Sequence, residues 1–230
     1  MHCLTRPSTN FIAAAGFAAF SLLTQHAQAS LVIKGVIDGD LSGGNPKAVL
    51  FEAGSDIGDL STYGFGSANN GGGSDGEEFT FSGSITTGQL IIVTANGTSD
   101  DFFSDNFVQD FVHFKSTEAG FTASVNGDDA IELFQGGSVI DTYGDINVNG
   151  DGETWDYTDG YAVRTGGVAG VFDQANYNSQ FQGLDTLAEA DQIATIAANF
   201  PVTAIPEPGA FAVIGLASLV NAFRYRRRNS

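Results

Sequence analysis

The chain has 230 residues and a formal net charge of −18, from 27 acidic and nine basic residues. This negative charge excludes nucleic-acid binding through a basic face, because phosphate groups would be repelled. The single cysteine, Cys3, excludes a disulfide framework within the chain.

Residues 1–29 have the pattern of a secretory signal peptide. Arg6 precedes an apolar stretch at 11–23, and Ala27 and Ala29 supply the small residues that surround a cleavage site. We expect signal peptidase to cut after Ala29, so that Ser30 begins the mature chain. The same cut would remove Cys3.

Short segments with strand character dominate residues 30–175. They are rich in β-branched and aliphatic residues and are separated by Gly, Asn, Asp and Pro, which favour turns. The expected strands are 31–37, 47–53, 78–82, 89–95, 130–135, 138–143 and 161–164. Gly136 and Gly137 join two of them as in a β-hairpin. Such strands, with little helical signal, predict an all-β fold, an antiparallel β-sandwich.

Five stretches of the sequence share one pattern, in which an aliphatic strand is entered or left through Asn, Asp or Gly. They are 44–52, 59–65, 87–93, 126–133 and 139–144. Together they resemble a lamin-tail-type domain, an immunoglobulin-like β-sandwich that recurs in secreted bacterial proteins. The resemblance places this domain at 30–175 and implies a binding or structural accessory module. Asp59 and Asp141 are expected to order neighbouring backbone.

Residues 145–156 match the spacing of a calcium loop. Oxygen-bearing side chains stand at alternate positions, glycine stands at the sixth and a carboxylate at the twelfth, as the six to eight oxygens around Ca²⁺ require. The candidate ligands are Asp145, Asn147, Asn149, Asp151 and Asp156. Two features depart from the motif, since Asp156 stands where Glu is usual and Gly152 replaces a hydrophobic residue. The alternative is a glycine-rich turn with incidental acidic residues.

Other polar residues offer weaker candidates. Asn126, Asp128 and Asp129 form a second oxygen cluster, for which capping of a turn is the alternative role. Paired carboxylates are typical of glycoside hydrolases, but any acid-rich protein offers them. The available ones are Glu52, Glu77, Glu78, Asp129 and Glu132. His113 is the only histidine outside the two ends, which excludes a multi-histidine zinc site.

Aromatic residues are unusually frequent at 102–121. The residues are Phe102, Phe103, Phe107, Phe111, Phe114 and Phe121. They can fill a core or form a surface patch that stacks on carbohydrate or on another copy, and Trp155 and Tyr157 allow the same two interpretations.

Helical spacing appears only at 184–199, where Leu184, Leu187 and Ile193 fall near one face and Pro201 would end the helix. We therefore expect 176–204 to be a helical or irregular linker. Between Ser30 and Pro206 there are four basic and 26 acidic residues, a net charge of −22. Such a surface repels anionic polymers and attracts divalent cations, although acidic residues can also serve solubility alone.

Residues 205–230 contain three features in a fixed order. Pro206, Glu207 and Pro208 precede an apolar run at 209–223, which as a helix would cover about 22 Å of a bilayer core of about 30 Å. A basic end follows with Arg224, Arg226, Arg227 and Arg228. This tail resembles the PEP-CTERM sorting signal of Gram-negative bacteria, which implies a transmembrane helix and cleavage by an exosortase. The alternative is an ordinary tail anchor with a proline-rich linker.

Together these features predict an exported, exosortase-processed, non-catalytic protein of the cell surface or extracellular matrix, with a binding or structural role. The expected partners are signal peptidase and exosortase during processing, the inner membrane in transit, exopolysaccharide in the matrix, and no nucleic acid. Calcium is the one expected cofactor. The alternative function is a small secreted hydrolase that acts on extracellular polymer through carboxylates.

Overall fold

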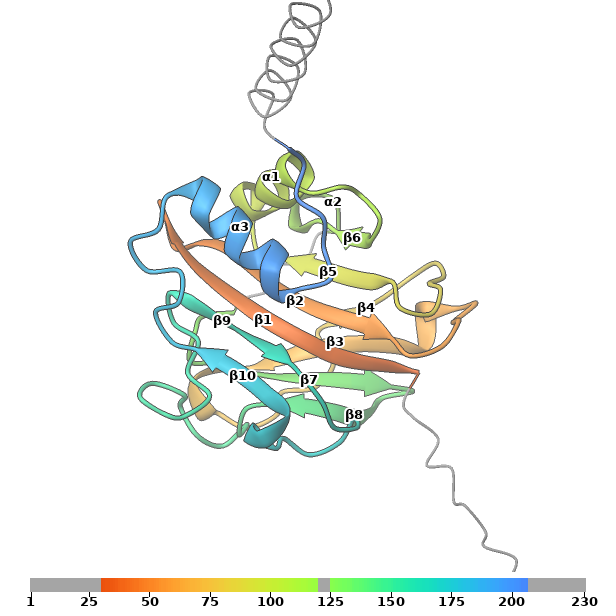
Figure 1. The fold of residues 1–230 in the computed structure, drawn as a ribbon. Helices are drawn as coiled ribbons and strands as arrows, with labels where there is room; N and C mark the ends of the chain where they lie inside the picture. The colour runs from red at the N-terminus through yellow and green to blue at the C-terminus, as the bar shows by residue number, and fades with distance from the viewer. Residues whose placement is uncertain (1–29, 120–124, 207–230) are drawn as a thin grey trace, which may run out of the picture.

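The computed structural model describes residues 30–119 and 125–206, and the strands in this part of the chain form two sheets (Figure 1). The larger sheet consists of β1 (Leu31–Leu41), β2 (Asn45–Ala53), β5 (Leu90–Thr94), β6 (Val112–Phe114), β9 (Gly160–Arg164) and β10 (Tyr177–Gln180). The smaller sheet consists of β3 (Tyr63–Ala68), β4 (Phe79–Thr80), β7 (Ala130–Gln135) and β8 (Ser138–Tyr143).

The strand order is β10-β9-β1-β2-β5-β6 in the larger sheet and β4-β3-β7-β8 in the smaller. Paired strands are antiparallel, except β5 and β6, which run parallel. The helical elements are α1 (Gly97–Asn106), α2 (Ser116–Ala119), α3 (Glu189–Asn199) and the 3-10 turns η1 (Leu60–Thr62), η2 (Asn69–Gly71) and η3 (Gln174–Asn176). The described chain is therefore mostly β, as predicted.

The main hydrophobic core lies between the two sheets. Successive side chains of a strand point to opposite faces, so Val49 and Phe51 of β2 turn toward the smaller sheet. There they share the core with Phe65, Ile131 and Leu133, all of which are fully buried. Two apolar faces packed on one another are compatible with the predicted β-sandwich.

A second core covers the outer face of the larger sheet. Leu50 and Ile92 point to this face and pack with Phe103 of α1 and with Ile196 and Phe200 at the end of α3. Figure 1 shows α1 and α3 on the same side of this sheet. α3 falls within the expected helical stretch 184–199, but α1 does not, so the expectation of little helix outside that stretch is wrong. Together α1 and α3 form a third layer.

The packed structure does not end at residue 175, the expected domain boundary. The segment 176–204, expected as a linker, contains β10, which pairs with β9, and α3, which packs on the sheet. Near its end, Ala204 forms a β-bridge with Phe107. The fold therefore includes this segment up to Ala204.

Among residues 30–119 and 125–206, no helix is long and apolar enough to cross a membrane. The expected signal peptide at 1–29 lies outside the described residues, as does the tail at 205–230 apart from Ile205 and Pro206. Both remain predictions.

Candidate functional site

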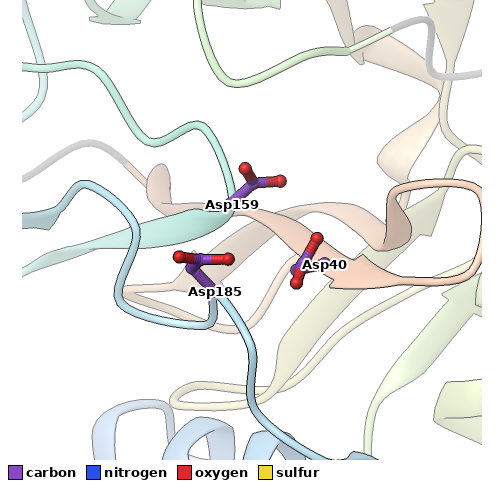
Figure 2. A group of neighbouring side chains, drawn as sticks. All are labelled: Asp40, Asp159 and Asp185. Atoms are coloured by element: carbon purple, nitrogen blue, oxygen red, sulfur yellow. The ribbon is translucent and has the colours of Figure 1, made fainter.

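Three aspartates from separate segments meet beside the end of β1. Figure 2 shows Asp40 on β1, Asp159 directly before β9 and Asp185 on the loop that precedes α3. Their carboxylate oxygens lie within 4.8 Å of one another. The antiparallel pairing of β1 with β9 brings the first two together. The third is held by the 2.8 Å hydrogen bond that Leu184 N donates to Asp159 O.

The charges of this cluster repel one another. Burial raises the pKa of Asp159, and the neighbouring carboxylates Asp40 and Asp185 raise it further. Asp40 also accepts a 2.9 Å hydrogen bond from Thr186 N. Asp159 and Thr186 have positive φ angles of 49° and 58°, a costly conformation for a β-branched residue such as Thr186. Chemically, three such carboxylates can coordinate one divalent cation, with water completing its oxygen shell.

The loop at 145–156 uses its side chains to order its own backbone. Asp145 accepts a 2.9 Å hydrogen bond from Asn147 N, and Asn149 accepts one of 2.8 Å from Asp151 N. Asp156 is buried and accepts 2.9 Å bonds from the backbone N–H groups of 152 and 158. Among the described residues, Asp40, Asp159 and Asp185 form the group of three acidic side chains whose oxygens all lie within 4.8 Å of one another, which we call the Asp40 cluster. The acidic residues of this loop form no such group. Calcium binding at 145–156 therefore remains a prediction.

The second oxygen cluster also caps backbone. Asp129 accepts hydrogen bonds of 2.7 Å from Asn126 N and 2.9 Å from Asn70 N. Asp59 accepts one of 2.9 Å from Ser61 N, and Asp141 accepts one of 2.8 Å from Ile33 N. These contacts confirm the backbone-ordering roles that the sequence predicts for Asp59, Asp129 and Asp141.

Most glutamates considered for hydrolysis have local partners. Glu52 lies 3.0 Å from Lys34 Nζ, Glu77 accepts a hydrogen bond from Thr80 Oγ1, and Glu78 accepts one from Ser67 N. Glu132 differs. It is only 3% exposed, and its carboxylate has no hydrogen-bond or ion-pair partner among the described residues.

His113 belongs to a buried polar network. Its Nε2 lies 3.1 Å from Thr94 Oγ1, and Thr94 donates a hydrogen bond to Asp100. Burial lowers the pKa of His113 to about 4. A nucleophile-base-acid triad needs the imidazole between the hydroxyl and the carboxylate, whereas here the hydroxyl of Thr94 lies in the middle and is fully buried.

The aromatic segment fills cores. Phe102, Phe103, Phe107 and Phe111 are all buried in the second core. Trp155 and Tyr157 are buried between the sheets, where both rings pack with neighbouring aromatic residues. Phe114 is half-buried and packs against the main core, where its ring contacts Phe79 and Phe81. Phe121 lies outside the described residues. The core interpretation is therefore confirmed for the described aromatic residues.

Comparisons with protein-family models, curated proteins and solved structures found no match. Of the predicted sorting signal, only Pro206 is described, and it is exposed. Glu207, Pro208 and the four arginines lie outside the described residues, as do Ala27 and Ala29. Membership of the lamin-tail and PEP-CTERM families is therefore a proposal.

Proposed function

We propose that this chain is an exported, exosortase-processed, non-catalytic protein of the cell surface or extracellular matrix, with a binding or structural role. The observation that carries the proposal is the order of features in the tail. Pro206-Glu207-Pro208 comes first, an apolar run at 209–223 that is shorter than a typical bilayer-spanning helix follows, and a basic end comes last. The arginines would hold that end in the cytoplasm while the domain lies on the other side.

The composition of the domain supports this destination. A body with a net charge of −22 remains soluble and resists association with anionic polymers unless cations bridge them. We propose that it is an immunoglobulin-like sandwich of the lamin-tail type, modified by the helical layer. Calcium at 145–156 is part of the proposal, as a bridge to matrix polymers such as exopolysaccharide.

The test compares two Gram-negative hosts, one with and one without its exosortase. The wild-type protein is expected to be released from the membrane only in the first host. A variant with Pro206→Ala and Pro208→Ala is expected to stay in the membrane fraction of both. Pro201→Ala, which changes an exposed proline five residues before the motif, is the matched control and should behave as wild type.

Two outcomes would contradict the proposal. One is wild-type protein that remains in the cytosol of both hosts. The other is a double proline variant that is processed as efficiently as the Pro201→Ala control.

A further inference from the structure

A pocket of about 500 Å³ lies on the outer face of the smaller sheet, beside its edge strand β8. Ile131 and Leu133 of β7 point into the inter-sheet core, so Glu132 between them points to the outer face. It lies opposite Thr142 of β8. The remaining wall includes Val139, Asp145 and the apolar pair Val171 and Phe172.

The loop that carries this apolar pair is fixed against β8. Thr142 N donates a 3.0 Å hydrogen bond to Gly170 O, and Gly170 N donates one of 3.0 Å to Asp141. The wall of the pocket is thus held to the edge strand by one backbone and one side-chain hydrogen bond. Its volume falls within the range of about 300–1,000 Å³ that is usual for small-ligand sites.

Glu132 is the unusual residue of this pocket. It is 3% exposed, and an acidic side chain with so little exposed area ordinarily has a hydrogen-bond or ion-pair partner in the protein. Among the described residues, three side-chain polar atoms are fully enclosed and have no hydrogen-bond partner. They are Ser104 Oγ, His113 Nδ1 and Gln192 Oε1. The oxygens of Glu132 are not among them, so its small exposed area includes the carboxylate, which a ligand in the pocket can reach.

The domain supplies no cation for this carboxylate. Each of the four basic residues between Ser30 and Pro206 has another acidic partner. The pairs are Lys34–Glu52, Lys47–Asp38, Lys115–Glu118 and Arg164–Asp141. None of the residues that line the pocket is basic, whereas Asp145 adds a second carboxylate. A cationic partner for Glu132 would therefore come from outside the domain.

We infer that this pocket binds a primary alkylammonium group, as in a lysine side chain or a free alkylamine, with the ammonium on Glu132 and the alkyl stem against Val139, Val171 and Phe172. An ammonium brings three charged donors to the carboxylate, and hydrogen bonds between charged groups are the strong ones. The apolar wall, in which Val171 is 94% exposed, gives the stem a surface to cover.

A hard metal ion is a less suitable partner for Glu132. Calcium needs six to eight oxygens, and Glu132 belongs to no group of three acidic side chains whose oxygens converge, in the part of the chain that is described. A neutral polyol would offer uncharged donors only. Binding of an alkylammonium group would give the proposed binding role a ligand class. It depends on contacts inside the domain and not on export, so amine binding and export can each be disproved without the other.

The experiment titrates full-length protein in detergent with n-pentylammonium and measures binding by calorimetry. Parallel titrations use Nα-acetyl-lysine N-methylamide, 1-pentanol and calcium chloride. Both ammonium compounds are expected to bind, with n-pentylammonium at least about tenfold tighter than 1-pentanol, the discrimination typical of a charged hydrogen bond. Tighter binding of the lysine derivative would indicate a peptide as the natural source, and equal binding a free amine.

Two variants and a control locate the site. Glu132→Gln keeps the shape of the side chain and removes its charge, and it should weaken n-pentylammonium binding about tenfold or more. Val171→Lys places a competing ammonium at the exposed rim and should also weaken binding. Glu118→Gln removes the same charge from an exposed residue of α2 that does not line the pocket, and it should bind as wild type. Near-ultraviolet circular dichroism checks that all three variants fold.

Several results would overturn the inference. They are equal binding of 1-pentanol and n-pentylammonium, absence of saturable amine binding at tens of millimolar, and displacement of the amine by calcium that is as strong in Asp145→Asn as in the wild type, since Asp145 also belongs to the proposed calcium loop. An equal loss of affinity in Glu132→Gln and Glu118→Gln would do the same, because it would show a response to net charge alone. None of these measurements involves secretion, so they leave the proposed export and processing untouched, and only the calcium titration bears on the calcium part of that proposal.

Discussion

Asp141 of β8 and Arg164 of β9 join the two sheets through a buried ion pair, in which both carboxylate oxygens lie 2.7 Å from Nη2 of the arginine. The same two side chains bind the backbone of Ile33, since Asp141 accepts from its N–H and Arg164 Nε donates to its carbonyl, each at 2.8 Å. The paired residues of β1 and β9 begin at Gly35. The ion pair therefore provides hydrogen-bond partners for the backbone N–H and carbonyl of Ile33, which lies just beyond the paired residues of β1 and β9.

Removal of one partner should be costly. Arg164→Met would leave Asp141 buried without its counter-ion, and we expect the free energy of unfolding to fall by about 3–5 kcal/mol in urea titrations. Lys34→Met breaks the more exposed pair with Glu52 and should cost about 1 kcal/mol or less. Equal losses in the two variants would show that the buried pair has no special role.

His113 should make stability depend on pH. Burial lowers its pKa to about 4, against an ordinary value of about 6.5 in the unfolded chain. Only the unfolded state binds a proton between these values, so this stabilising contribution is complete above pH 6.5 and is lost as the pH falls toward 4. Because His113 is partly exposed, we expect a loss of about 1 kcal/mol between pH 7.5 and pH 5.

The measurement compares urea unfolding of the wild type and of His113→Gln at both pH values. Both proteins contain the same acidic residues, so the effect of those residues cancels when the losses of stability between the two pH values are compared. A variant that loses as much stability as the wild type between pH 7.5 and pH 5 would contradict the assignment.

Asp159→Asn should stabilise the fold at pH 7 in the presence of chelator. Burial and the neighbours Asp40 and Asp185 raise the pKa of Asp159, so its charged form is disfavoured in the folded state. Asparagine removes the charge and tolerates the positive φ angle of 49°. We expect a higher Tm whose gain shrinks in high salt and disappears at acidic pH, where Asp159 is protonated.

Asp75→Asn is the control for net charge, since Asp75 is exposed and stands outside the cluster. We expect a smaller rise in Tm for Asp75→Asn than for Asp159→Asn. A fall in Tm for Asp159→Asn would show that its carboxylate makes a favourable contact instead.

Calcium binding at 145–156 predicts a rise in Tm, because a ligand that binds only the folded state stabilises it by about 2.7 kcal/mol at a hundred times its Kd. Asp145→Asn removes one charge but can keep the hydrogen bond from Asn147 N, so it should reduce the calcium effect without unfolding the loop. Absence of any shift at millimolar calcium would dismiss the site. If the calcium-induced rise in Tm is lost only in Asp159→Asn, the calcium site is the Asp40 cluster and not the loop at 145–156.

Strands with strong local signals could be predicted from the sequence. The aliphatic run at 89–95 contains β5, and the hairpin of β7 and β8 turns at Gly136 and Gly137. These glycines have φ angles of 58° and 77°, as a two-residue hairpin turn requires. Here the local residues determine the local structure.

Elements that depend on distant contacts were missed. β3 is not among the expected strands, and it contains Gly64 and Gly66, which weaken a strand signal. A Cβ at Gly64 would lie 2.3 Å from Phe79 O, so the glycine permits close approach of another segment. Helix α1 is capped by Asn96, which accepts a hydrogen bond from Ser99 N. Its two phenylalanines, Phe102 and Phe103, are adjacent instead of recurring at helical spacing, so the apolar pattern does not predict a helix.

The two acidic features of the structure also lacked a sequence signal. Asp40, Asp159 and Asp185 are far apart in the chain and converge only through the pairing of β1 with β9 and the loop before α3. Glu132 is flanked by Ile131 and Leu133, which predicts an outward-facing residue. Its burial comes from residues near 145 and 171 that cover this face.

The intact mass of the protein recovered from the medium of an exosortase-containing host tests export and exosortase processing together. We predict a chain that begins at Ser30 and ends close to Pro206, and a host without exosortase should yield a membrane-bound form that retains the tail. Recovery of the chain with both hydrophobic ends intact from the cytosol would contradict it.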